Sequence, residues 1–343
     1  MLADRAGISQ REEPHVDCAF IIGTERSGSN LLRVILDAHP DMTVPHPPHV
    51  LRYLSDIHGE SAQPERLVDD MLAFVKHHIH PWEHVPERDA LLERVRKDPT
   101  PVGAFLALYD LHAARLGSPA WACKSTFVVH HTAAILERRP RARFLWLVRD
   151  PRDVAASSMS SVFNPYDPLL TGALWDVQQR EAMAAHARLG DDVVMRLHYE
   201  DLLASPELTT ARICDHLGIR LHGDMLAFHE RSRAKHTATL SASWKNASQP
   251  VLRGNSGKWR TQLDAAQVAR VEGVCRETMQ ALDYVPESDG QTPPAAAFVL
   301  ARGRDWAMRL QGEWRSLRHD EIHWRRWRRR ARVARLRLRE ALR

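Results

Sequence analysis

The sequence predicts an α/β protein, a three-layer sandwich with a central, mostly parallel sheet and a basic helical extension at its C-terminus. Three observations support this fold class. Short apolar runs alternate with longer segments of helical periodicity, the pattern of a parallel sheet covered by helices on both faces. The first apolar run leads through a turn with two glycines directly into a helix. Residues 323–343 contain ten arginines and one acidic residue.

The strands are expected at short apolar runs, of which Arg143 to Val148 is the clearest. Helices are expected where apolar residues recur every three or four positions, as in the segment that follows the glycine turn. His39-Pro40 ends this first helix. The expected strands are 18–23, 120–124, 143–148 and 193–197, and the expected helices are 27–38, 102–116, 133–138, one from about 153, and 173–189.

Composition divides the chain into four parts. Residues 1–15 are polar, and we expect a flexible N-terminus there. Residues 16–285 contain the expected strands and form the main domain. Residues 286–297 have the Pro, Gly, Ser and Gln content of a linker, and residues 298–343 form an Arg-rich helical extension.

Charge and apolar content limit the location and the partners. The chain has a net charge of +5, but residues 323–343 alone carry +9, so residues 1–322 carry −4. This distribution argues against nucleic acid as a partner of the body. No membrane span or signal peptide is evident, and the four scattered cysteines fit a reducing compartment. We therefore expect a cytoplasmic protein, with peripheral membrane attachment as an alternative.

The segment Gly23-Thr24-Glu25-Arg26-Ser27-Gly28-Ser29-Asn30 is a P-loop-like phosphate-binding loop that lacks two residues. The pattern G-x-x-x-x-G-K-[ST] would place Lys at position 29 and a hydroxyl at position 30. Two glycines before a helix still direct backbone N–H groups at an anion, and Arg26 can supply the missing charge. Loss of the hydroxyl that holds Mg²⁺ argues against a P-loop kinase. We expect a metal-free anion site, unless the glycines merely shape the turn.

A second anion ligand is expected at the end of the strand 143–148. Arg149 leaves this strand at its carboxyl end, where open α/β sheets bind their ligands, and Ser157 follows one or two helical turns later. Together they would hold a second phosphate. The alternative is that Arg149 pairs on the surface with Asp150 or Asp153.

These two segments resemble the two nucleotide-binding motifs of PAPS-dependent sulfotransferases, in the branch of the protein-tyrosine and bacterial enzymes (PAPS is 3′-phosphoadenosine 5′-phosphosulfate). Four further segments match this family in the same order, over roughly residues 18–285: Leu36-Asp37-Ala38-His39-Pro40, Trp121-Ala122-Cys123-Lys124-Ser125, His198-Tyr199-Glu200-Asp201-Leu202 and Gly257-Lys258-Trp259. The resemblance implies the sulfotransferase fold for residues 16–285 and PAPS as co-substrate, with no metal.

The resemblance also implies roles for individual residues. The 5′-phosphosulfate would bind the loop, and the 3′-phosphate would bind Arg149 and Ser157. Lys124 and Arg26 would stabilise the charge on the departing oxygen. The nucleotide-binding residues implied in this way are Thr24, Glu25, Arg26, Ser27, Gly28, Ser29, Asn30, Arg149, Ser157, Tyr199, Lys258 and Trp259.

The general base is expected at a histidine. The tyrosine branch carries the sequence G-E-E shortly after its D-A-H-P segment, whereas this chain reads Val44 to Arg52 without a carboxylate. His46 and His49 lie there, and an ordinary imidazole titrates near neutral pH. His46 ranks slightly ahead by alignment, although either could be a packing residue. Glu25 is expected to turn away from the anion and pair with a basic neighbour, and in a minority reading it is the base.

The expected reaction is in-line transfer of a sulfuryl group from PAPS to a hydroxyl of a small molecule, carbohydrate or lipid. The alternatives are a non-catalytic nucleotide- or anion-binding module and a P-loop kinase. For residues 323–343 we favour a helix that packs Trp324 and Trp327 against the body. The alternative, a more specific functional hypothesis, is that this segment associates with a membrane surface.

Overall fold

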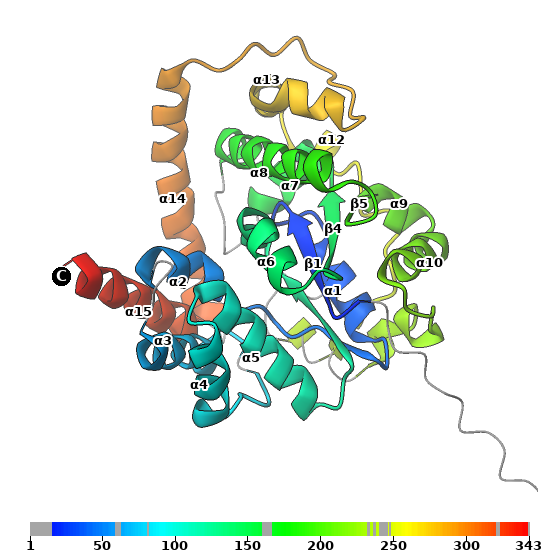
Figure 1. Ribbon diagram of the computed structural model, residues 1–343. Helices are drawn as coiled ribbons and strands as arrows, with labels where there is room; N and C mark the ends of the chain where they lie inside the picture. Colours follow the sequence, from blue (N-terminus) through cyan, green and yellow to red (C-terminus); the bar gives the residue numbers. More distant parts are fainter. Residues whose placement is uncertain are drawn as a thin grey trace, which may run out of the picture.

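A five-stranded parallel sheet forms the centre of the molecule in the computed structural model (Figure 1). The structure describes residues 16–58, 63–80, 82–159, 167–231, 234–235, 238–239, 246, 248–319 and 323–341. The strand order is β2-β3-β1-β4-β5. The strands are β1 (Cys18–Gly23), β2 (Met42–Thr43), β3 (Ala120–Lys124), β4 (Arg143–Val148) and β5 (Val194–His198). The predicted α/β class is confirmed, and β2 is the strand that the sequence pattern did not reveal.

The strands are continuous apolar runs because helices cover both faces of the sheet. In β1, Phe20 and Ile22 point to one face, and Ala19 and Ile21 point to the other; none is more than 1% exposed. The second of these faces packs against α1 (Ser29–Asp37), α9 (Tyr199–Ala204) and α10 (Pro206–Leu217). The result is a three-layer arrangement.

The first face carries the larger helical layer. It consists of α2 (Val50–His58), α3 (Pro64–Lys76), α4 (Arg88–Lys97), α5 (Pro101–Arg115), η1 (Thr126–His131), α6 (Thr132–Arg138), α7 (Pro151–Met159), α8 (Pro168–Leu189) and α13 (Ala265–Ala281). Shorter helical turns, which are η2 (Gly223–Met225), η3 (Phe228–Glu230) and α12 (Trp259–Gln262), lie in the connections before α13.

The residues that follow the strands lie together at the carboxyl edge of the sheet. Gly23 pairs with Leu147, so β1 and β4 end nearly level. Gly23 has a φ of +122°, and a Cβ atom there would lie 2.3 Å from the carbonyl oxygen of Leu147. Glycine is therefore required for this close approach. The loop after β1, Lys124 of β3, Arg149 after β4 and Tyr199 after β5 all emerge at this edge.

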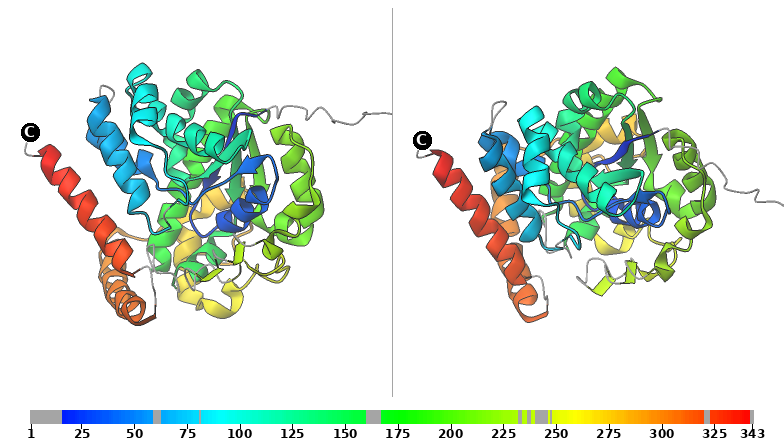
Figure 2. Two further views of the ribbon diagram at one scale, coloured as in Figure 1. Left: turned by 90° about the horizontal axis from the view of Figure 1, so that it is seen from below. Right: turned by 60° about the horizontal axis from the view of Figure 1, so that its bottom comes forward.

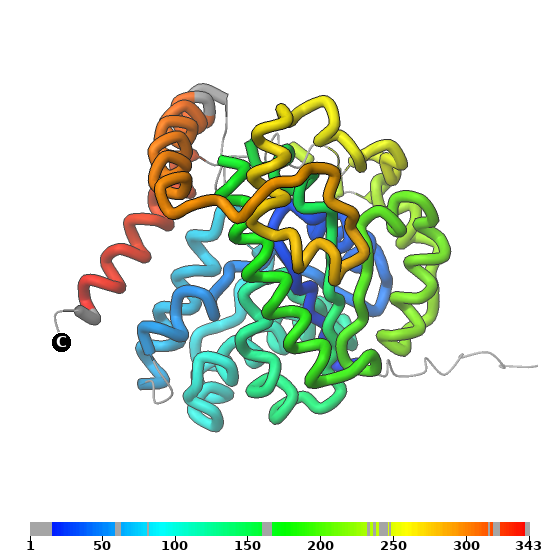
Figure 3. Tube along the Cα trace, turned by 90° about the horizontal axis from the view of Figure 1, so that it is seen from above, coloured from blue at the N-terminus to red at the C-terminus, as the bar shows by residue number. Residues whose placement is uncertain are grey.

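The C-terminal extension forms two helices, α14 (Ala295–His319) and α15 (His323–Ala341). Both lie on the side of the molecule that carries α2 to α4, away from α9 and α10 (Figures 1, 2 and 3). Helix α14 begins inside the range 286–297, which the composition had indicated as a linker. No helix in the described ranges is both long enough and apolar enough to cross a membrane.

Polar contacts attach the extension to the body. Asp305 of α14 accepts a hydrogen bond from the backbone N–H of Asp167 (3.2 Å), and Arg339 of α15 donates to Asp70 of α3 (2.5 Å). The expectation that Trp324 and Trp327 pack against the body is wrong, because these side chains are 65% and 48% exposed. The face of α15 that meets the body instead carries Leu336, Arg329 and Arg339, whereas the buried Arg326 pairs with Glu313 of α14.

Candidate active site

The loop between β1 and α1 has the backbone of an anion cradle. Arg26 and Gly28 both have positive φ values, of 70° and 90°. A positive φ is costly for a residue with a Cβ atom, so its presence at Arg26 indicates a loop shaped for a purpose. Gly28 is the N-cap of α1 and no side chain caps this helix, which leaves its first N–H groups available for an anion.

Arg26 connects the loop to the end of β4. Its Nε and Nη2 atoms donate to the hydroxyl oxygen of Ser157 at 3.2 and 3.1 Å. Arg149 Nη1 donates to the carbonyl oxygen of Arg26 at 3.0 Å. Burial, and then the nearby charge of Arg149, lower the pKa of Arg26. The two predicted anion ligands therefore lie side by side, and Ser157 contacts Arg26.

Tyr199 lies where the glycine loop meets Arg149, and these three elements together form what we call the junction. The guanidinium carbon of Arg149 lies 4.5 Å from the centre of the Tyr199 ring, and a Cβ atom at Gly28 would lie 2.2 Å from the same ring. The hydroxyl of Tyr199 accepts a hydrogen bond from Asn255 Nδ2 at 2.7 Å. The ring thus lies between the glycine loop and the arginine after β4, in contact with both.

Asn255 is a site residue that the sequence analysis missed. Its side-chain oxygen accepts from Lys258 Nζ at 2.6 Å, and its carbonyl oxygen accepts from Arg149 Nη2 at 3.0 Å. The available signal was its position two residues before the Gly257-Lys258-Trp259 segment. Asn255 brings Lys258 to the same junction as Tyr199 and Arg149.

Two buried polar atoms at this junction suit an anionic ligand. Ser27 is fully buried and Arg149 is 5% exposed. Within the described ranges, neither Ser27 Oγ nor Arg149 Nε has a hydrogen-bond partner. Buried polar groups are seldom left in this way unless a ligand or water completes them. Arg149 also lies 3.9 Å from Asp153, but its burial does not fit the alternative of a surface ion pair.

Thr24, Asn30 and Trp259, which are among the predicted nucleotide-binding residues, have side chains engaged in other contacts. Thr24 Oγ1 accepts a hydrogen bond from Gln179 at 3.1 Å, and Asn30 Oδ1 accepts from Arg33 at 3.0 Å. The ring of Trp259 packs between the guanidinium groups of Arg152 and Arg260, 4.0 and 4.2 Å from its centre. These contacts support the loop and the 257–259 turn.

The turn at residues 257–259 is held by Asp153. Its two carboxylate oxygens accept from the backbone N–H groups of Gly257 at 2.7 Å and Trp259 at 3.0 Å. Asp153 lies on α7, directly after the Arg149 segment. This arrangement fixes Lys258 and Asn255 relative to the end of β4.

Lys124 lies at the carboxyl end of β3, next to β1, where Ile21 is its partner in the sheet. Burial lowers the pKa of Lys124; the neighbouring carboxylate of Glu25 opposes this shift, and Arg33 and Arg26 add to it. The Glu25 carboxylate faces Arg52 at 3.9 Å, the kind of pairing expected for it. Lys124 thus adds a second cation beside Arg26.

His46 and His49 lie on the segment before α2, close to Lys124. His49 has a φ of +53°, and its Nδ1 is 3.1 Å from the hydroxyl of Ser125, the residue after Lys124. The ring of His46 packs against that of His80 with centres 4.3 Å apart. Burial lowers the pKa of both histidines well below its usual value, and nearby cations add to the effect. Both side chains are therefore neutral at neutral pH.

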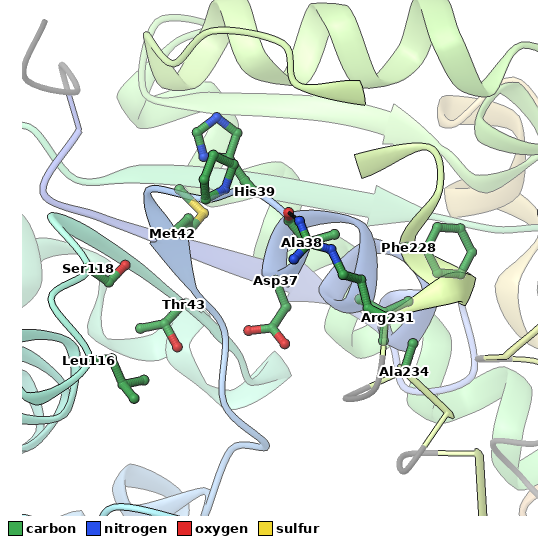
Figure 4. Close-up of a pocket in the computed structure, with 12 residues that line it drawn as sticks. Asp37, Ala38, His39, Met42, Thr43, Leu116, Ser118, Phe228, Arg231 and Ala234 are labelled. Atoms are coloured by element: carbon green, nitrogen blue, oxygen red, sulfur yellow. Dashed lines mark hydrogen bonds between the residues drawn. The ribbon is translucent and has the colours of Figure 1, made fainter. Parts of the chain in front are cut away.

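A cavity of about 330 Å³ lies at the far end of α1 from Gly28 (Figure 4). Asp37, Thr43 and Arg231 are among its lining residues. Arg231 donates to the carbonyl oxygen of Ala38 at 3.4 Å. Because α1 separates it from the glycine loop, this cavity does not belong to the anion site.

The chain is similar in sequence to known sulfotransferases. The profile of the sulfotransferase family matches residues 19–223. The protein-tyrosine sulfotransferase of Drosophila melanogaster is 25% identical over 264 residues, which cover 74% of this chain and 48% of that protein. Protein-tyrosine sulfotransferase A of Caenorhabditis elegans is 22% identical over 303 residues, covering 86% of this chain and 74% of that protein. The chain thus spans about half the length of the fly relative.

A solved structure shares the fold. The sulfotransferase domain of the Synechococcus PCC 7002 olefin synthase superposes with a TM-score of 0.53 at 23% identity, over 78% of this chain and 98% of that chain. At this identity the likeness concerns the fold.

Proposed function

Because the chain belongs to the sulfotransferase family, we propose that it transfers the sulfuryl group of PAPS to a hydroxyl of its acceptor and releases PAP, the 3′,5′-bisphosphate. The observation that carries this proposal is the contact of Tyr199 with both Gly28 and Arg149. A donor with a 3′-phosphate and a 5′-phosphosulfate on one ribose needs two neighbouring anion sites, and the adjacent glycine loop and Arg149 support this proposal.

The residues at the junction divide between the two ends of the donor. Arg26, Ser27 and the uncapped N–H groups of α1 would hold the 5′-phosphosulfate. Arg149 and Lys258 would hold the 3′-phosphate, and Ser157, which was also expected there, accepts two hydrogen bonds from Arg26. The unpartnered atoms of Ser27 and Arg149 are the donors that such a ligand would satisfy.

PAPS supplies an activated sulfuryl group, and the chain supplies charge and position. Negative charge develops on the oxygen that links the sulfuryl group to PAP, and Arg26 and Lys124 are the cations placed to stabilise it. The shared role explains how the loop functions without the lysine of the usual phosphate-binding pattern. Partial desolvation strengthens both interactions because the local dielectric is low.

His49 is the better candidate for the base that takes the acceptor proton. The alignment ranked His46 slightly ahead, but the ring of His46 packs against His80, whereas His49 reaches the residue next to Lys124. Burial lowers the pKa of His49, which leaves a lone pair on the neutral ring for the acceptor proton and makes the ring a weaker base than an ordinary imidazole. We propose a hydroxyl-bearing small molecule, carbohydrate or lipid as the acceptor; the segment 44–52 lacks the carboxylate of the tyrosine branch, which argues against tyrosine in a protein.

A thermal-shift comparison tests the donor. PAP without metal should raise the melting temperature strongly, and ATP with Mg²⁺ should have little effect, because the site binds a 3′-phosphate and lacks a hydroxyl ligand for Mg²⁺. An equal response to both nucleotides would count against the assignment of Arg149 and would favour a general nucleotide-binding module.

The variant Lys124→Met tests whether the site is catalytic. It should retain PAP binding and lose on the order of 10²–10³ in transfer rate from PAPS. The matched control is Lys97→Met, because the Lys97 side chain is 75% exposed on α4. Full activity of Lys124→Met would remove this lysine from the mechanism.

A further inference from the structure

Helix α14 presents its apolar side to solvent. Its buried residues, Ala301, Asp305 and Ser316, face the body or α15. Large apolar side chains follow at spacings of three, four and seven residues on the opposite side, which is one stripe of a helix. They are Val299, Trp306, Leu310, Trp314 and Leu317, and each is between 45% and 65% exposed.

Helix α15 repeats this arrangement and adds positive charge. Trp324, Trp327 and Leu338 are 65%, 48% and 60% exposed, on the side away from Leu336. Arg328 and Arg335 are exposed beside this apolar stripe. Amphipathic helices with tryptophan and leucine on one side and arginine along its border are typical of the membrane interface.

The exposed apolar surface is concentrated on these two helices. Among the described residues, fourteen large hydrophobic side chains are exposed, and nine of them lie on α14 or α15. Every exposed tryptophan among them belongs to the extension. Scattered single residues of this kind are normal on a soluble protein, but a group of this size marks an interaction surface.

We propose that α14 and α15 together bind the surface of an anionic lipid bilayer. The charge of the chain selects this partner: residues 323–343 carry +9, so a second copy of the extension would be repelled, whereas anionic lipid head groups would be attracted. Nucleic acid would use the arginines but not the apolar stripes. A bilayer satisfies both, because the indole and leucine side chains enter the interface while the arginines meet the head groups.

The proposal does not depend on the identity of the reaction, since PAP binding and lipid binding are measured separately. The full-length chain is sedimented with vesicles of phosphatidylcholine alone and of phosphatidylcholine with about 30% phosphatidylglycerol. We expect binding to the anionic vesicles to exceed binding to neutral vesicles by at least about tenfold, and 0.5 M NaCl to weaken it.

Two double variants test separately the apolar and the charged contributions of α14 and α15 to vesicle binding. Trp306→Ser with Trp324→Ser removes apolar contacts, and Arg328→Glu with Arg335→Glu removes charge attraction. Each pair should reduce binding to anionic vesicles by at least about tenfold. The matched control is Leu208→Ser, which changes a 64% exposed side chain on α10, on the other side of the molecule. All three variants should melt cooperatively and bind PAP as the wild type does.

Several outcomes would overturn the proposal. They are no vesicle binding, equal binding to both vesicle types, or unchanged binding in both double variants. Self-association of the wild type that is lost in the tryptophan variant, without vesicle binding, would assign the surface to a second copy instead. Loss of vesicle binding only in the arginine variant, together with tight binding to a DNA duplex, would assign it to nucleic acid.

Discussion

Substitution of Gly28 by alanine tests the central feature of the site, the contact of the loop with Tyr199. A Cβ atom at this position would lie 2.2 Å from Cδ2 and Cε2 of Tyr199, whereas ordinary contacts begin near 3.4 Å. The ring would have to move by about 1.2 Å, the difference between these two distances. It is held by Asn255 at 2.7 Å from its hydroxyl and by Arg149 at 4.5 Å from its centre.

The magnitude follows from the contacts that this movement breaks. A hydrogen bond contributes about 1 kcal/mol and a partly desolvated cation–π contact contributes about 1 kcal/mol. Loss of both would shift the equilibrium away from the binding-competent arrangement of Tyr199 and Arg149 by about 2 kcal/mol, which weakens the apparent affinity for PAP roughly 30-fold. The positive φ of Gly28 adds about 1 kcal/mol of strain, which lowers the free energy of unfolding whether or not PAP is bound.

Gly117→Ala is the matched control that separates strain from the clash. Gly117 has a φ of +65°, and a Cβ atom there would meet nothing within 4 Å. This variant should therefore lose about 1 kcal/mol of stability and bind PAP normally. The measurements are urea unfolding for stability and isothermal titration calorimetry for PAP affinity.

Removing the Tyr199 ring tests whether the clash with this ring is the reason that Gly28→Ala weakens PAP binding. In a Tyr199→Ser background, Gly28→Ala should reduce PAP affinity much less than it does in the wild type, because the obstructing ring is gone. The reasoning is refuted if Gly28→Ala binds PAP within about twofold of the wild type. It is also refuted if the two substitutions have independent effects on PAP affinity.

Three further predictions concern the proposed base His49, the site residue Asn255 and the buried carboxylate of Glu272. Because burial lowers the pKa of His49, kcat/KM should be flat from about pH 8 to 6.5 and should fall only at lower pH as the imidazole gains a proton; a pH–rate profile with an acid limb centred above pH 7 would contradict this assignment. Asn255→Ala should weaken PAP binding about tenfold in calorimetry with little change in melting temperature, since it removes hydrogen bonds to Tyr199 and to the lysine at 258. Glu272→Gln should lower the free energy of unfolding by about 2 kcal/mol in urea, because its fully buried carboxylate pairs with a buried arginine at 2.8 Å; Glu277→Gln, which changes an 84% exposed carboxylate on the same helix, should cost less than about 0.5 kcal/mol.

The local sequence pattern was sufficient to predict an element wherever one short segment determines its own structure. The strands β1, β3, β4 and β5 were predicted because strands buried on both faces must be continuous apolar runs. The glycine loop was predicted because its positive φ values need particular residues and because a helix must follow it. The location of Arg149 beside the loop could be predicted from its position after a strand, since the carboxyl ends of parallel strands share one edge.

The tertiary structure decided which of these segments meet and which face each side chain takes. The two-residue strand β2 has no sequence signal, because pairing with β3 alone makes it a strand. Asn255 joins the site across 56 positions to Tyr199, and the ranking of His49 over His46 depends on a contact with Ser125, 76 positions away. The outward tryptophans of the extension contradicted the expectation from composition. Hydrophobic periodicity shows that a helix has two sides, but only the packing of the whole chain determines which side is buried.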